Sequence, residues 1–122
     1  MKREPAHLRR GREAEARACH YLQRQGLRLV ERNFRSRLGE VDLIMDDGGA
    51  LVFVEVRYRA HPAFGSGAES IDVRKRRRVI SAAQIYLQRT GSENRACRFD
   101  VVSVGGETLD WTRNAFDGSG AV

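Results

Sequence analysis

Two acidic residues, Asp42 and Glu55, lie on either side of a short glycine-containing segment. Residues 40–45 and 51–58 are rich in apolar and β-branched side chains, and the glycines at 48–49 predict a hairpin turn between two strands. If those two glycines alone form the turn, Asp42 lies directly opposite Glu55. Opposed residues on one face of an antiparallel pair have Cβ atoms roughly 4.5–5.5 Å apart. A loop one residue longer would break this pairing.

Two carboxylates so close repel each other unless a cation or a shared proton lies between them. A divalent metal with oxygen ligands is the natural resolution. Residues 51–56 form a continuous apolar run interrupted only by Glu55, which predicts a strand buried on both faces. A buried acid needs a partner. The alternative is a structural ion pair between strands, joining Arg57 to Glu55 or to Glu40, without a function.

A third acid, Glu15, belongs to a helix predicted at residues 8–25. It is followed at i+3 and i+7 by Ala18 and Leu22, so it lies on or beside the apolar stripe of that helix. Glu13 is expected to face water. Glu15 is therefore a candidate to join the two acids of the hairpin.

The elements that must position these acids follow from periodicity and from glycine stops. The pattern predicts helices at residues 8–25 and 72–89 and strands at 27–34, 40–45, 51–58, 98–104 and 107–111. This order indicates one α/β domain spanning 1–122, with a central mixed five-stranded sheet flanked by helices. Residues 1–7 and 117–122 are expected to be loose tails.

The composition favours a polyanionic partner. Lysine and arginine number 22 against 16 acids, which gives a net charge of +6 and a pI near 10.1. Nucleic acid and an anionic membrane face both suit such a balance, although arginine content also follows genomic GC content. The chain has no apolar run long enough to cross a bilayer and no signal sequence, and Cys19 and Cys97 have no metal-binding spacing. We expect a cytoplasmic protein with reduced thiols and no membrane contact.

Five consecutive cations, Arg74 to Arg78, open the second predicted helix. Cations at a helix N-terminus interact unfavourably with the helix dipole, and a bound phosphate would reduce that repulsion. The alternative is that these cations form a solvent-exposed face without a ligand. Lys75 is the residue expected to approach a nucleic-acid backbone most closely. The candidate nucleic-acid contacts are Arg59, Arg74, Lys75, Arg77 and Arg78.

Taken together, these motifs resemble the YraN-like uncharacterised bacterial protein family over about residues 11–116. The matching positions are Gly11, Glu15, Asn33, Gly39-Glu40-Val41-Asp42-Leu43-Ile44, Phe53-Val54-Glu55-Val56-Arg57, Arg59, Phe64-Gly65, Lys75, Arg98-Phe99-Asp100-Val101-Val102 and Asn114-Ala115-Phe116. That family is similar to archaeal Holliday-junction resolvases, and it belongs to the restriction-endonuclease-like superfamily with its PD-(D/E)xK motif. The resemblance implies a restriction-endonuclease-like fold.

The resemblance also implies a catalytic set of Asp42, Glu55 and Arg57. It implies Mg²⁺, with Mn²⁺ as a surrogate, bound by Glu15, Asp42, Glu55 and the Val56 carbonyl. The sequence departs from the motif twice. Val41 replaces the proline, and Arg57 replaces the lysine. A guanidinium stays protonated, so Arg57 could orient water or stabilise charge on phosphorus but could not accept a proton as a buried lysine can.

These observations leave three hypotheses. The first is a divalent-metal-dependent endonuclease for branched or structured DNA, acting as a homodimer by analogy with resolvases. The second is a nucleic-acid-binding module of the same fold that does not cut. The third is a protein-interaction domain whose charges are only surface charges.

Overall fold

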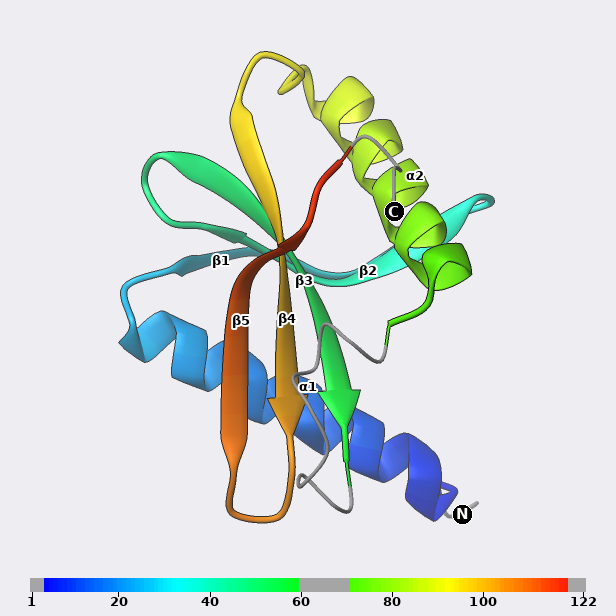
Figure 1. Cartoon of the computed structure of the whole chain (residues 1–122), viewed down its shortest axis with the longest axis vertical. Coiled ribbons are helices and arrows are strands. Elements are labelled where there is room, and N and C mark those ends of the chain that lie inside the picture. The colour runs from blue at the N-terminus through cyan, green and yellow to red at the C-terminus, as the bar shows by residue number, and fades with distance from the viewer. Residues whose placement is uncertain (1–3, 60–70, 119–122) are drawn as a thin grey trace.

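The computed structural model describes residues 4–59 and 71–118. The predicted order of elements is confirmed (Figure 1). The elements are α1 (Ala6–Arg24), β1 (Arg28–Ser36), β2 (Gly39–Asp46), β3 (Ala50–Tyr58), α2 (Val73–Thr90), β4 (Ala96–Val104) and β5 (Leu109–Phe116). Of the motif positions, Phe64 and Gly65 lie outside the described residues.

The five strands form one mixed sheet in the order β1-β2-β3-β4-β5. Neighbouring strands are antiparallel except β3 and β4, which run parallel because α2 provides the crossover between them. The strand β3 is thus central, and its residues Leu51 to Glu55 are all buried. The prediction of an α/β fold with a mixed five-stranded sheet is confirmed.

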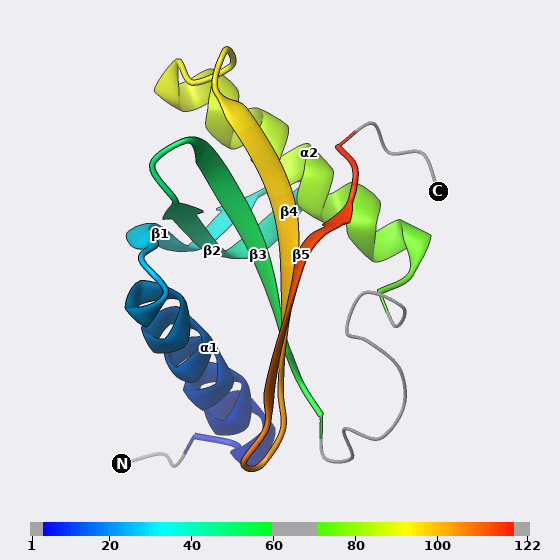
Figure 2. The ribbon, with the colours of Figure 1, turned by 60° about the vertical axis from the view of Figure 1, so that its left-hand side comes forward.

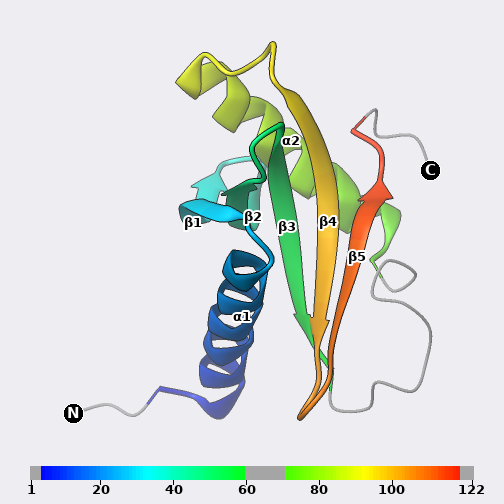
Figure 3. The same ribbon diagram turned by 90° about the vertical axis from the view of Figure 1, so that its left-hand side faces the viewer.

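The two helices cover opposite faces of the sheet (Figures 2 and 3). The α2 face packs an aromatic core in which Phe53 stacks on Phe99 with ring centroids 5.5 Å apart. The α1 face packs Leu22 of the helix against aliphatic residues of the central strands, including Val52 and Val54. Alternate residues of β3 therefore face different helices. Side chains from both helices can in this way lie near the carboxyl end of β3.

The predicted tails are partly ordered. The helix α1 begins at Ala6, so the last residues of the expected tail 1–7 are helical, and of the tail 117–122 only 117 and 118 are described. No helix in the described ranges is long and apolar enough to span a membrane.

Candidate metal centre

The hairpin between β2 and β3 has the predicted register. Four pairs from Leu43↔Val54 to Asp46↔Leu51 follow it, and the Asp47 amide donates to the Ala50 carbonyl at 3.2 Å. The regular pairing ends one residue before Asp42 and Glu55.

Beyond that point, the Val56 amide donates to Asp42 Oδ2 at 2.8 Å. The Asp42 carboxylate therefore accepts a hydrogen bond from a backbone amide of β3. This bond holds the carboxylate beside the end of β3.

The other side of Asp42 is also irregular. The β1–β2 register would place Asn33 opposite Asp42, but Asn33 has φ of 52° and the recorded pairs pass from Arg32↔Leu43 to Phe34↔Val41. Such a left-handed residue interrupts a strand, and asparagine tolerates it better than most. Asp42 thus lies at a local break in the sheet, partly open to solvent.

Glu15 of α1 interacts with Asp42 and Asn33 at the same break. Burial and the charge of Asp42 raise the pKa of Glu15, and a hydrogen bond with the Asn33 side chain opposes that shift. Glu13, two residues earlier, is exposed and pairs with Arg9.

Glu55 has a partner that the sequence did not indicate. Its carboxylate is buried, and Lys75 Nζ from the first turn of α2 lies 2.7 Å from Glu55 Oε1. The helix is fixed there because the Asp72 carboxylate caps it by accepting the Lys75 amide at 2.8 Å. The only buried acids among the described residues are Glu55 and Asp100.

The surroundings of Asp42 favour its protonated form. Burial first, and the charge of Glu55 second, raise the pKa of Asp42 to about 7; the Val56 amide and Lys75 oppose this shift. At neutral pH the Asp42–Glu55 pair therefore binds a proton readily and gains from any cation that replaces it.

Arg57 and Glu40 occupy the edges of this site. Arg57 is half-buried, and burial and the nearby Arg59 lower its pKa, whereas the charge of Glu55 raises it. Glu40 forms an ion pair with Arg35 of β1 at 3.5 Å. At Glu55 there is a helix-to-strand ion pair with Lys75, and the charge of Glu55 also acts on Arg57. A structural ion pair that involves Arg57 stays an alternative.

The donor set suits a hard divalent cation. In the described ranges, no three acidic, histidine or cysteine side chains lie close enough to form a metal cluster by themselves. Mg²⁺ does not require one, because it is usually held by one or two carboxylates and completed by water and substrate phosphate. Asp42 and Glu55 fit that requirement, while Glu15 and the Val56 carbonyl as ligands stay predictions.

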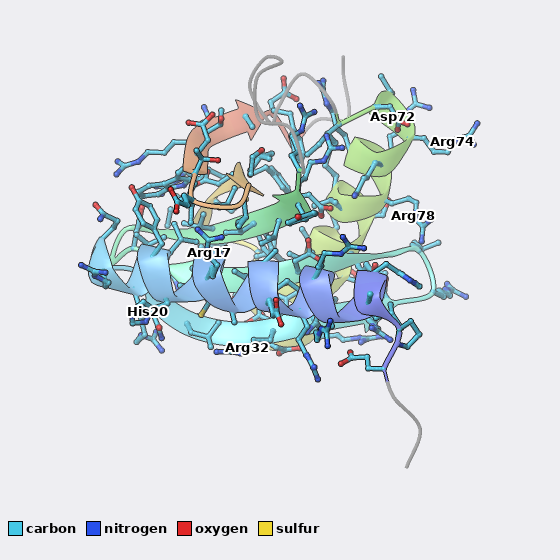
Figure 4. All side chains as sticks on the ribbon, turned by 90° about the horizontal axis from the view of Figure 1, so that it is seen from below. Arg17, His20, Arg32, Asp72, Arg74 and Arg78 are labelled. Atoms are coloured by element: carbon cyan, nitrogen blue, oxygen red, sulfur yellow. The ribbon has the colours of Figure 1, made fainter. Side chains whose placement is uncertain are left out.

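The candidate nucleic-acid contacts on α2 lie beside this site. Glu55 and Lys75 line a pocket together with Glu40, Arg74 and Arg78. Figure 4 shows Arg74 and Arg78 projecting outward from α2, next to the Asp72 cap. Lys75 differs from them because its ammonium lies on Glu55.

Sequence reasoning missed a second acidic centre. Asp100 of β4 is fully buried and accepts hydrogen bonds from Arg98 Nε, Trp111 Nε1 and the Asn114 amide at 2.9–3.2 Å. Asn114 has φ of 50°, like Asn33, and it lies where the β4–β5 register shifts. With all these donors in place, Asp100 is a structural anchor of β5. The available signal was the occurrence of an acid within an apolar strand.

Comparisons with known proteins agree with the motif pattern. A model of "Uncharacterised protein family UPF0102" matches residues 14–104. A UPF0102 protein of Nitrosococcus oceani is 53% identical over 115 residues, covering 90% of this chain and 93% of the relative. One from Dechloromonas aromatica is 56% identical over 107 residues, covering 88% of each.

Among solved structures, a Holliday junction resolvase from Archaeoglobus fulgidus superposes with a TM-score of 0.48 at 14% identity, covering 81% of this chain and 72% of the other. The family resemblance seen in the motifs is confirmed by the sequence matches. The chain belongs to the uncharacterised protein family UPF0102.

Proposed function

We propose that this protein is a divalent-metal-dependent endonuclease that hydrolyses phosphodiester bonds in branched or structured DNA. The observation that carries the proposal is the pair Asp42 and Glu55, held side by side at the end of β3 with the Lys75 ammonium on Glu55. The exposed arginines beside that pair, and the resemblance to the PD-(D/E)xK motif, support nucleic acid as the substrate.

Asp42 and Glu55 would hold Mg²⁺, which supplies an activated water and neutralises charge on the phosphate. The chain keeps Asp42 in place through the Val56 amide, and keeps Glu55 in place through burial. Arg57 stays cationic at the edge of the site, where it can orient the phosphate or stabilise its growing charge.

Lys75 has a separate task. In the metal-free protein its ammonium neutralises Glu55. If a bound cation neutralised that carboxylate instead, the Lys75 ammonium would be free to contact other groups. It can then donate to a phosphate oxygen, which would provide from α2 the lysine that the motif lacks at position 57.

The direct test is cleavage of labelled four-way junction, nicked, duplex and single-stranded DNA in Mg²⁺ or Mn²⁺. The matched variants are Asp42→Asn, which keeps the shape and an oxygen acceptor, and Glu13→Gln, which removes an exposed acid from α1. We expect wild type and Glu13→Gln to cut, and Asp42→Asn to lose at least about 100-fold in rate. Equal products from all three proteins, or none on any substrate, would refute the proposal.

The second candidate is a module that binds DNA without cutting it. The Lys75–Glu55 ion pair favours it, since the buried acid already has a cation from the chain itself. Binding to branched DNA that is equal in EDTA and in Mg²⁺, unchanged in Asp42→Asn and accompanied by no cleavage, is the result expected of this module.

A further inference from the structure

A shallow groove lies beside the carboxylates, between the β1–β2 turn and α2. It is lined by Leu38 at the tip of the turn and by Arg74, Arg77 and Arg78 on the helix. Arg74 and Arg78 also line the pocket that contains Glu55, so the groove is continuous with the candidate metal centre.

The tip of the turn is fixed against the helix. A Cβ added to Gly39 would lie 2.1 Å from the Arg78 carbonyl oxygen, so backbone meets backbone there. The Ser36 hydroxyl donates to the Gly39 carbonyl and accepts the Leu38 amide, which closes the turn. Leu38 is therefore held at a defined place beside the arginines.

The side chains that line the groove include three arginines and one exposed leucine. Arg74, Arg77 and Arg78 are exposed, and the structure records no ion pair for them in residues 4–59 and 71–118. Leu38 is 51% exposed, one of three large apolar side chains that the described surface leaves open. Rows of arginine suit phosphates, and leucine is among the apolar residues that insert where bases unstack.

We infer that this groove binds the DNA backbone next to the scissile bond, and that Leu38 contacts a base face exposed where the duplex is interrupted. The inference rests on the proposed function for its choice of DNA. It adds a physical basis for selecting branched or nicked substrates: the arginines bind every form of DNA, whereas only an interrupted stack offers Leu38 a base face.

The test is DNA binding in EDTA, measured by fluorescence anisotropy on a four-way junction and on intact duplex of the same arm sequences. Replacing Arg74, Arg77 and Arg78 by alanine should weaken binding to both forms at least about tenfold. It should also reduce the slope of log K against log salt by roughly 2–3, since each phosphate contact contributes about 0.9. A control with Arg24, Arg89 and Arg113 replaced by alanine also removes three exposed arginines and should change binding much less.

Leu38→Ser should weaken binding to the junction about fivefold or more and leave duplex binding unchanged. Leu8→Ser is the matched control, because Leu8 is 53% exposed but does not line the groove. If the triple alanine variant of the groove binds DNA as tightly as the control variant, the groove does not bind the DNA backbone. An unchanged ratio of junction to duplex affinity in Leu38→Ser would overturn the base contact. Because binding in EDTA needs no hydrolysis, a failed cleavage assay leaves this inference standing, and lost groove binding leaves the metal site standing.

Discussion

At the scale of single residues, the contact between Lys75 and Glu55 organises the site. A buried carboxylate without a partner is costly, and Lys75 provides that partner at 2.7 Å. On the proposed function, a metal bound by Glu55 would compete with this ammonium for the carboxylate, and both cations would contribute positive charge next to a bound phosphate.

This competition gives a prediction for Lys75→Met. DNA cleavage should fall by about 100-fold or more, as for the loss of one charge-stabilising donor. Binding of Mn²⁺ without DNA, measured by calorimetry, should tighten, because the competing cation is gone. A purely structural lysine would not give opposite changes in the two measurements.

The controls for that variant are Lys75→Arg and Arg89→Met. The first should retain part of the cleavage activity because it keeps the charge, and the second, an exposed arginine outside the site, should retain all of it. Loss of both Mn²⁺ binding and cleavage in Lys75→Met would contradict the proposed role.

The raised pKa of Asp42 predicts a pH dependence of stability in the metal-free protein. Because the folded pKa of about 7 lies above the ordinary value of 3.8, folding favours the protonated form. That contribution is complete below pH 4 and is lost as the pH rises through 7. In EDTA, the Tm of wild type relative to Asp42→Asn should therefore fall between pH 4 and pH 7.

An opposite trend is expected at Asp46, whose pKa is lowered to about 2 by hydrogen bonds from Arg95 and the Gly48 amide. Its contribution is present above pH 4 and is lost as the pH falls toward 2, so the Tm of wild type relative to Asp46→Asn should fall on acidification. For Asp42, a Tm difference between wild type and Asp42→Asn that does not change across pH 4–7 would show that burial and Glu55 do not raise its pKa.

At the scale of elements, glycine-to-alanine substitutions at Gly39 and Gly11 give a matched pair of variants that tests the packing of β2 against α2. In Gly39→Ala, the new methyl group meets the backbone of Arg78, so β2 must move from α2 at a cost of about 1–3 kcal/mol. In Gly11→Ala, the methyl group meets nothing within 4 Å inside a helix, so stability should rise by about 0.5–1 kcal/mol. Urea unfolding of both variants measures this, and equal effects would contradict the close packing at Gly39.

The anchor at Asp100 is a separate element-scale prediction. Asp100→Asn keeps the volume of the side chain but removes the charge that Arg98 and Trp111 contact, which should cost about 2 kcal/mol or more in the free energy of unfolding. Fluorescence of Trp111, the only tryptophan, reports the same region directly. A variant as stable as wild type with unchanged fluorescence would exclude the anchoring role.

The sequence predicted the elements well and their irregularities poorly. Strand periodicity and the glycine turn were sufficient for the order of elements and for the register of β2 against β3. The breaks at Asn33 and Asn114 follow from backbone angles of two asparagines that also occur in ordinary loops and strands, so no local pattern predicts them. At the second of these positions, the Asn114 amide donates to Asp100.

The same limit applies to the site. The hairpin register, which is local in sequence, was sufficient to predict that Asp42 and Glu55 lie near each other, and the charge of Glu55 does act on Asp42. Lys75 could not be placed on Glu55, because that contact depends on how α2 crosses the sheet after the β3 strand ends. A run of five cations predicts a charged surface, and only the packing of the helix selects which of them turns inward.

At the scale of the whole molecule, the two helices bring different charges to one end of the central strand. The helices α1 and α2 lie on opposite faces of the sheet (Figure 2). Glu15 of α1 interacts with Asp42, and Lys75 of α2 forms the ion pair with Glu55. Arg74, Arg77 and Arg78 of α2 are exposed and line the groove next to this site. The homodimer stays a prediction.

The most direct test of the metal centre is a crystal structure with Mn²⁺ at neutral pH, using anomalous scattering to locate the ion. We expect an ion bound by both Asp42 and Glu55, with the Lys75 ammonium moved off Glu55. An intact Lys75–Glu55 ion pair with no anomalous signal between the two carboxylates, at Mn²⁺ concentrations that saturate ordinary magnesium enzymes, would contradict it.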